Sequence, residues 1–243
     1  MNRATKYLAF ATSVVVLGVG SLALPAAALG SGPRGTTGAA APCRAVSVKP
    51  VVHDDAVRRE ATLTALAARL RARKDPFGLN APQIDALEAA KTAISALDGQ
   101  IATTCYPSFD ALKTDAKKLF VDYRVYWLRG PQTHVIEAAD RLAEARTRLG
   151  KASAKLGALV GSNAAAATDL AAMNQDLANA DSKLGTPPTA GPSIAAVVAL
   201  LPAADMTHDS AVLQGARGDL VAVRAALAQA RADGLKVVND LQH

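Results

Sequence analysis

The chain has 243 residues, of which 27 are Lys or Arg and 21 are Asp or Glu, so its formal net charge is +6 at pH 7. These charges are spread along the chain and form no dense cluster of lysine and arginine, which argues against nucleic acid as a partner. A mildly basic chain favours anionic polymers of the cell envelope or lipid headgroups as partners instead.

The first 28 residues have the three zones of a secretory signal peptide. Arg3 and Lys6 precede an apolar run over residues 7–24, and a proline and three alanines close the segment at Ala28. The apolar run is long enough that an uncleaved membrane anchor remains an alternative, but the proline and the small residues favour cleavage. We therefore expect an exported protein, secreted and possibly associated with the cell wall.

Residues 29–52 are rich in Gly, Pro, Thr and Ala and have no apolar periodicity, so we expect a flexible leader. The chain has two cysteines, Cys43 and Cys105, and an exported chain meets an oxidising environment in which such a pair closes. A disulfide between them would stabilise the fold by about 4 kcal/mol in the chain-entropy model. Because there is no Cys-x-x-Cys motif, we interpret the pair as a structural disulfide.

Residues 53–243 are predicted to form a single helical domain, and residues 53–130 are its base of three helices. Apolar periodicity and the turn residues that interrupt it predict helices over about 54–74, 82–105 and 108–129. Short connections make consecutive helices antiparallel neighbours, which brings Cys105 back toward the beginning of the first helix. The expected topology thus supports the predicted disulfide.

Residues 131–243 are predicted to form a long helical hairpin, because leucine returns at every seventh position. This spacing keeps one apolar stripe facing a partner helix, as in a coiled coil. A first arm over about 133–184 would be followed by a reversal at glycines and prolines and by a second arm that ends near Leu241. The predicted seam of the first arm consists of Leu142, Leu149, Leu156, Asn163, Leu170, Leu177 and Leu184.

Asn163 is the ambiguous position of this seam. A continuous helix makes it a polar seam residue that fixes register, whereas Gly161-Ser162-Asn163 can also be a helix stop followed by a new N-cap. We favour continuity, because the seven-residue phase resumes unchanged at Leu170. The predicted fold is therefore an elongated all-α bundle of about five helices with a long antiparallel coiled-coil hairpin, and the alternative is a compact six-helix bundle.

The segment from residue 106 to residue 134 holds six of the seven aromatic residues that follow the signal peptide. One interpretation is that these rings fill the core of an alanine-rich bundle. The other is a ligand patch, in which rings stack on a flat or sugar-like group and a basic side chain supplies a polar contact. The candidate patch consists of Tyr123, Arg124, Tyr126, Trp127 and His134.

About twenty residues of this region carry a resemblance to a known group of proteins. They span residues 122–141 and include Asp122-Tyr123-Arg124-Val125-Tyr126, Gly130-Pro131-Gln132-Thr133-His134 and Ala138-Ala139-Asp140-Arg141. This stretch resembles a segment of uncharacterised secreted helical proteins from actinobacteria. The resemblance implies an exported, all-helical chain and supplies no activity and no catalytic residues.

The sequence has no pattern typical of a metal site or of a catalytic centre. Its four histidines are scattered, without the helical spacing or the cysteine neighbours that a metal needs. There is no nucleophile elbow, phosphate-binding glycine loop or metalloprotease helix. We therefore predict a protein that is not an enzyme and that has no metal and no cofactor.

We expect a binding or structural module that acts at the cell surface on an unknown protein or an anionic envelope polymer. One alternative is a membrane-active protein that uses the apolar segment 193–201, so a membrane surface is a possible partner. A second alternative is a small-ligand carrier centred on the aromatic segment 106–134. The sequence favours a monomer over a dimer, because the two arms of the hairpin can cover each other.

Overall fold

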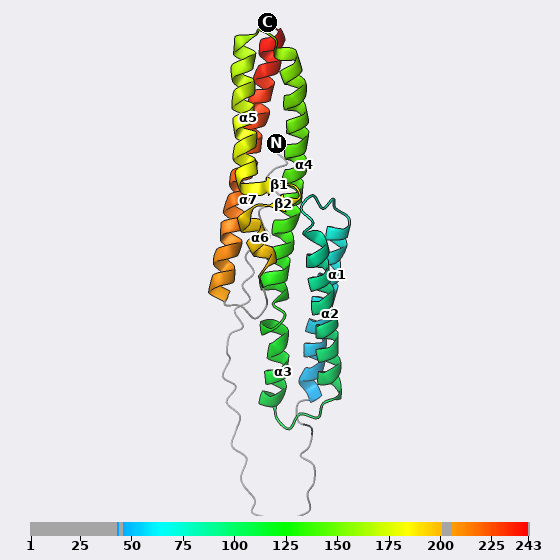
Figure 1. Ribbon diagram of the computed structural model, residues 1–243. Helices are drawn as coiled ribbons and strands as arrows, with labels where there is room; N and C mark the ends of the chain where they lie inside the picture. The colour runs from blue at the N-terminus through cyan, green and yellow to red at the C-terminus, as the bar shows by residue number, and fades with distance from the viewer. Residues whose placement is uncertain (1–42, 44–45, 201–205, 243) are drawn as a thin grey trace, which may run out of the picture. The chain divides into compact units, whose positions relative to one another are not determined.

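The computed structural model describes residues 43, 46–200 and 206–242, all within the unit that spans residues 41–243. These residues are helical apart from turns and a two-stranded sheet, which confirms the predicted all-α class (Figure 1). The predicted signal peptide and most of the predicted leader lie outside the described residues. The end of the leader is helical, because a 3₁₀ turn at Val46–Val48 leads directly into α1.

The base begins with an antiparallel hairpin of α1 (Lys49–Arg71) and α2 (Asn80–Thr103). Asp75 organises the turn between them, since its two carboxylate oxygens accept hydrogen bonds from the backbone N–H groups of Leu79 and Asn80 at 2.8 and 3.0 Å. The two helices pack through apolar rows at helical spacing. The largest buried side chains of this contact are Leu63, Leu70, Leu87, Ile94 and Ile101.

The two cysteines are paired as predicted. Cys43 and Cys105 form a disulfide with their Cα atoms 5.1 Å apart, a distance within the usual range for such a bond. Beside it, the Nζ atom of Lys49 donates hydrogen bonds to the carbonyl oxygens of Ala102 and Thr104 at 2.9 and 2.7 Å. The beginning of α1 is thus fixed to the end of α2 by covalent and polar contacts.

The predicted helix over residues 108–129 is interrupted. α3 spans Phe109–Val121, with the Ser108 side chain accepting a hydrogen bond from the N–H of Ala111 as its N-cap. Arg124 then adopts a left-handed conformation with φ 42° and ψ 42°, and a π-helical turn, η3, follows at Val125–Arg129. A left-handed residue cannot continue an α-helix. The change of direction places the aromatic residues of η3 at the junction with α4.

The prediction of a continuous helix from residue 133 to residue 184 is wrong. α4 spans Gly130–Val160, the backbone turns at Gly161 with φ 51°, and α5 spans Ala164–Leu184. Asn163 is the N-cap of α5, because its side chain accepts a hydrogen bond from the N–H of Ala166 at 3.0 Å. The residue is therefore a cap and not a polar seam position, and the six-helix alternative was correct in placing a turn here.

After α5, a two-residue hairpin of β1 (Gly185–Thr186) and β2 (Thr189–Ala190) leads into α6 (Pro192–Val198) and α7 (Met206–Gln242). Helices α4, α5 and α7 then form a three-helix bundle (Figure 1). The described residues thus contain six α-helices of 13 residues or more, and α6 is an additional short one.

The leucine seam survives this change of topology. Its leucines on α4 are half-buried, and those on α5 are half-buried or buried against the same apolar core. Each helix keeps the seven-residue spacing because both helices serve the one core, each from its own side. The second arm is predicted to carry one row of Met206, Leu213, Leu220, Leu227 and Leu241 and another of Ala216, Val223, Ala230 and Val237. On α7 the second row is buried, and so are the middle three leucines of the first, whereas Met206 is exposed and Leu241 is half-buried.

Candidate binding groove

Four of the five residues of the predicted ligand patch lie around the junction of η3 and α4. Arg124 is buried, whereas Tyr126 is 50% exposed and Trp127 is 77% exposed. His134 lies one turn into α4 and is exposed. Tyr123 is separate, because its ring packs against the core of the base and its hydroxyl donates to the carbonyl of Ala93 at 3.4 Å. The first four line adjoining cavities, and Tyr123 does not.

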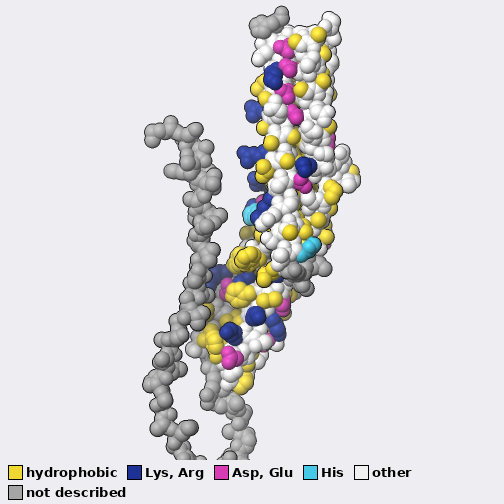
Figure 2. Space-filling view, turned by 90° about the vertical axis from the view of Figure 1, so that its left-hand side faces the viewer, with side chains coloured by type: hydrophobic (Ala, Val, Ile, Leu, Met, Phe, Trp, Pro, Cys, Tyr) yellow, Lys and Arg dark blue, Asp and Glu magenta, His cyan; other side chains and the backbone are white. Residues whose placement is uncertain are grey.

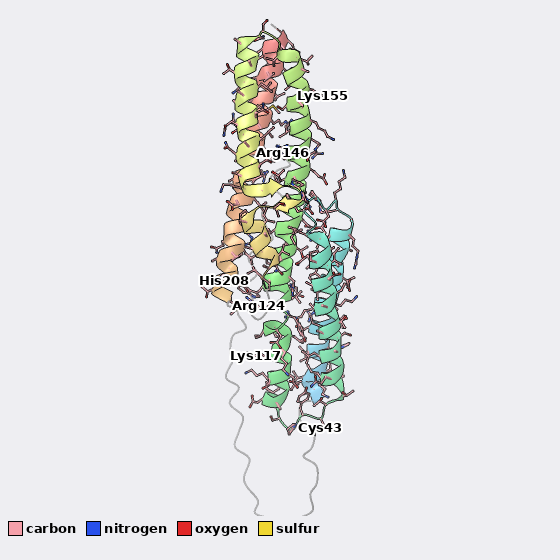
Figure 3. All side chains as sticks on the ribbon, viewed as in Figure 1. Cys43, Lys117, Arg124, Arg146, Lys155 and His208 are labelled. Carbon is pink, nitrogen blue, oxygen red and sulfur yellow. A yellow bond between two sulfur atoms is a disulfide. The ribbon has the colours of Figure 1, made fainter. Side chains whose placement is uncertain are left out.

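Arg124 forms a buried ion pair with Asp209, at the beginning of α7. The Nη1 atom of Arg124 lies 2.6 Å from Oδ2 of Asp209, and both side chains are almost fully buried. A buried pair of this kind holds its elements together strongly, because removing one partner leaves an uncompensated charge. Figure 3 shows Arg124 at the level of the start of α7, where His208 is labelled. The pair thus ties the strained turn before η3 to a helix 85 residues away.

A second arginine fixes the position of Tyr126. Arg59 of α1 is 4% exposed, and its Nε atom donates to a carboxylate oxygen of Asp55 at 2.7 Å. Its guanidinium carbon lies 4.4 Å from the centre of the Phe120 ring and 4.9 Å from the centre of the Tyr126 ring. Cation–π contacts of this length stabilise a fixed ring orientation. The exposed face of Tyr126 is therefore presented by a rigid support.

Three cavities adjoin along the exposed face of α4. The first, of about 240 Å³, lies between η3 and the beginning of α7 and is lined by the Arg124–Asp209 pair, Trp127 and Met206. The second, of about 430 Å³, lies between α1 and η3 and shares Tyr126 and Pro131 with the first.

The third cavity, of about 480 Å³, lies between α1 and α7 and shares Arg69 and His134 with the second. Because neighbouring cavities share lining residues, they lie next to one another along α4, and we call the three together the groove. Its floor is α4, one wall is formed by α1 and η3, and the other wall is α7.

The acidic side chains of the groove are already paired. Glu137 is buried and accepts hydrogen bonds from the Nε and Nη2 atoms of Arg69, with the first at 2.9 Å. The Nε atom of Arg73 lies 3.8 Å and Nδ1 of His134 lies 3.7 Å from the same carboxylate. Asp209 is held by Arg124 as described above. The charge that the groove presents to solvent is therefore positive.

Three groove arginines, by contrast, have no ion pair and no hydrogen bond with any residue that the structure describes. They are Arg141 on α4 and Arg217 and Arg224 on α7, and all three are exposed. Arg141 and Arg224 line the same cavity, where their like charges repel each other, and a bound anion would relieve this repulsion. Guanidinium groups suit carboxylate and phosphate, which they bind with two parallel hydrogen bonds.

The sequence prediction missed the part of the site that α7 supplies. Asp209, Met206, Arg217 and Arg224 lie far along the chain from the aromatic segment, and nothing in their own neighbourhood marks them. The seven-residue spacing of Arg217 and Arg224 was the one available signal, since it places both on the same edge of a helix. Their relation to Trp127 depends on the packing of α7 beside α4.

The apolar segment 193–201 does not present an apolar tip in its described part. Ile194 and Val197 of α6 are fully buried, and Leu200 is nearly so, within the core that α6 shares with α7. The Nε2 atom of Gln132 donates to the carbonyl oxygens of Val197 and Leu200 at 2.8 and 3.0 Å, which fixes the segment to α4. None of the described helices combines the length and the apolar character that a membrane crossing requires.

Within the described part of the chain, no three histidine, cysteine or acidic side chains come together as a set that could hold a metal ion. Among the described histidines, His53 is hydrogen-bonded to Asp98 at 2.7 Å and His134 lies in the groove. Comparisons of the chain with protein-family models, with curated proteins and with solved structures find no match.

Proposed function

We propose that this chain is an exported, non-enzymatic binding module of the cell surface, and that its binding site is the groove between α1, η3 and α7. The observation that carries the proposal is the exposed Trp127, 77% accessible, beside the buried pair of Arg124 and Asp209. Large exposed aromatic side chains on a rigid support are typical of recognition surfaces. The partner that suits it has an apolar or planar part and a negative charge.

The backbone at this position supports a functional interpretation. Arg124 adopts a left-handed conformation, which is costly for a residue other than glycine, and it is followed by a π-helical turn. Such strain persists where the surrounding structure enforces it, and it clusters at binding and catalytic sites. Here the strain turns Tyr126 and Trp127 outward. A regular helix through residue 124 would have continued the amphipathic pattern and buried more of this aromatic surface.

The polar groups of the groove suit binding better than proton transfer. Arginine keeps its charge under all ordinary conditions, so a guanidinium supplies a fixed positive potential and a fork of hydrogen-bond donors. The carboxylates of Glu137 and Asp209 are buried in ion pairs. We therefore assign the groove to holding a partner, with the aromatic end for its apolar or planar part and the arginines for its charge.

The same cavities favour a small-ligand carrier as the second candidate. Their volumes, from about 240 to about 480 Å³, approach those of sites for small organic molecules. The membrane-active alternative has less support, because the apolar side chains of α6 that it needs at the surface are buried. A monomer is supported by the seams of α4, α5 and α7, which are covered within the chain.

The proposal is tested with the purified chain, labelled with a fluorophore and mixed with envelope preparations from the organism that encodes it. We expect saturable binding, and we expect the double variant Tyr126→Ala/Trp127→Ala to bind at least about tenfold more weakly. A tenfold weaker affinity corresponds to a loss of about 1.4 kcal/mol of binding free energy. A single aromatic anchor at the centre of an interface commonly contributes more than this to binding. Depletion of the label from the supernatant measures the bound fraction.

The matched control is the double variant Leu235→Ala/Val238→Ala, which removes two exposed apolar side chains from the far end of α7. It should bind as the unchanged chain does. Equal binding by all three proteins, or no binding by any of them, contradicts the proposal. If fragments of low molecular mass alone compete fully and quench the fluorescence of Trp127, the small-ligand carrier replaces the surface module.

A further inference from the structure

Two rows of basic residues follow α4 and α7 at intervals of seven residues. The row on α4 consists of Arg141, Arg148 and Lys155, and the row on α7 consists of Arg217, Arg224 and Arg231. All six side chains are exposed, and none makes an ion pair or a hydrogen bond with a described residue. Figure 2 shows Lys and Arg side chains gathered along one edge of the bundle, and in Figure 3 the labelled Lys155 lies on the outer side of α4.

The two rows run side by side because α4 and α7 are parallel neighbours. Pro131 and Leu213 line one cavity near the start of both helices, and Arg141 and Arg224 line another further along. Val160 and Val237 pack together at the far end. Arg148 follows Arg141 by seven residues, and Arg231 follows Arg224 by seven residues. Both steps advance about 10.5 Å along parallel helix axes, so Arg148 and Arg231 are expected at the same height along the bundle.

Neighbouring cations of the bundle differ from these six because they are paired within the fold. Arg146 binds Asp181 of α5 with two hydrogen bonds at 2.7 and 2.6 Å, and Lys183 binds Asp219 of α7 at 2.6 Å. Acidic side chains thus accompany the cations that join helices. Along the two rows, Glu144 lines a cavity with Arg148 but forms no ion pair with it among the described residues. The rows form a track of positive charge, of about 21 Å along each helix, that extends the groove away from its aromatic end.

We propose that this track binds a linear polyanion, a flexible polymer with a phosphate group on each repeat. Basic side chains spaced along the track can each contact a different phosphate of the polymer, the arginines with bidentate hydrogen bonds, and the released counterions make such binding favourable at low salt. The inference deepens the proposed function and rests on it in part, because Arg141, Arg217 and Arg224 belong both to the groove and to the track.

The surface between the rows favours such a polymer over an acidic helical peptide. A docking helix needs an apolar stripe to bury, and the α4 residues between the rows include the small Ala145 and Ala152, which offer little apolar area. An extended peptide would need unpaired backbone groups, which the two helices do not supply. A polyanion needs only the side-chain charge that is present.

The experiment uses the chain without its predicted signal peptide. It measures the affinity of this protein for long-chain inorganic polyphosphate. The variant Arg217→Gln/Arg224→Gln/Arg231→Gln should bind at least about tenfold more weakly. In a plot of log affinity against log salt concentration, the slope for this variant should be smaller in magnitude by roughly 2, as expected for three lost phosphate contacts. The variant Arg141→Gln/Arg148→Gln/Lys155→Gln, on the other helix, should behave in the same way.

The matched control is Lys91→Gln/Lys113→Gln/Lys117→Gln, which removes the same charge from α2 and α3 and should keep its affinity within about twofold of the unchanged chain. The three sets of substitutions to glutamine change side chains that have no ion pair or hydrogen bond with a described residue, and circular dichroism checks that all variants fold. The variant Tyr126→Ala/Trp127→Ala should still bind polyphosphate, so the track is tested separately from the aromatic end.

Equal losses in the control and in the track variants would overturn the proposal, because the effect would then follow net charge alone. Triphosphate that binds as tightly as the polymer would also overturn it, since a single anion pocket would suffice. Tighter binding of polyglutamate than of polyphosphate would identify an acidic peptide as the occupant in its place.

Discussion

Arg124 and Asp209 show how single residues determine the geometry of the groove. One belongs to a strained turn and the other to the first turn of α7, and their side chains meet at 2.6 Å in a buried environment. The attraction between them opposes the cost of the left-handed backbone at Arg124 and the cost of burying two charges. The orientation of the neighbouring Trp127 depends on this balance.

The variant Asp209→Ala should lower the free energy of unfolding by about 3 kcal/mol, because it leaves the guanidinium of Arg124 buried without its carboxylate. Urea denaturation followed by circular dichroism measures the change. The control Asp54→Ala removes an exposed acid of α1 and should change stability by less than about 0.5 kcal/mol. A loss for Asp209→Ala no larger than that of the control would show that the pair contributes little to stability.

Asp140 gives the stability of the protein a dependence on pH. Its side chain is 1% exposed, and neither carboxylate oxygen has a hydrogen-bond partner among the described residues. Burial raises the pKa of this carboxyl to about 7, and the negative charges of Asp75 and Glu144 act in the same direction. The nearby Asn80 side chain and the positive charge of Arg73 lower the pKa, but they do not outweigh burial.

Because the pKa of Asp140 is higher in the folded than in the unfolded chain, folding is favoured while the group is protonated. The free energy of unfolding should therefore decrease from about pH 4 to about pH 7, with a slope from this group of up to about 1.4 kcal/mol per pH unit. The variant Asp140→Asn, which cannot ionise, should lose this slope and be more stable than the unchanged chain at about pH 8. Urea denaturation across this range measures both curves, and parallel curves would contradict the assignment.

At the scale of elements, the turn between α4 and α5 decides how the second half of the chain folds. Gly161 adopts φ 51°, and Asn163 accepts a hydrogen bond from Ala166 while its Nδ2 atom donates to the carbonyl of Asp240 at 2.8 Å. The side chain thus caps α5 and also satisfies a carbonyl at the end of α7. One residue joins the ends of all three helices of the bundle.

The variant Asn163→Leu should lower the melting temperature, because it removes the cap and the hydrogen bond to Asp240. The expected loss is about 1 to 2 kcal/mol, the upper part of the range for N-cap substitutions. Thermal denaturation followed by circular dichroism is the measurement, with Ser162→Ala in the same turn as control. A higher melting temperature for Asn163→Leu would instead indicate an unbroken helix with a polar seam residue.

The heptad pattern predicted which faces of these helices are buried, but not how the helices are connected. Leu170, Leu177 and Leu184 share the phase of the leucines on α4, and this agreement predicts a continuous helix. A helix that turns back onto the same core needs the same spacing, so phase alone cannot separate the two cases. The backbone preference of Gly161 and the capping side chain of Asn163 were the local signals that favoured the turn.

At the scale of the described unit, the groove exists because three distant segments meet. α1 contributes Arg69, the η3–α4 junction contributes the aromatic residues, and α7 contributes Asp209 and the arginines. The parallel arrangement of α4 and α7 then converts two local repeats of basic residues into a single charged track. Neither the groove nor the track belongs to one element, so both depend on the packing of the bundle.

The amino-acid sequence by itself determined the helical class, the disulfide of Cys43 and Cys105, the buried rows of α7 and the segment in which the candidate site lies. These follow from local periodicity, from turn residues and from the presence of just two cysteines, which do not require knowledge of distant contacts. The tertiary structure decided that the chain turns at Gly161, that Arg124 pairs with Asp209 and that Arg141 lies beside Arg224. Such relations are set by which helices pack against each other, and that choice depends on the free energy of the complete core.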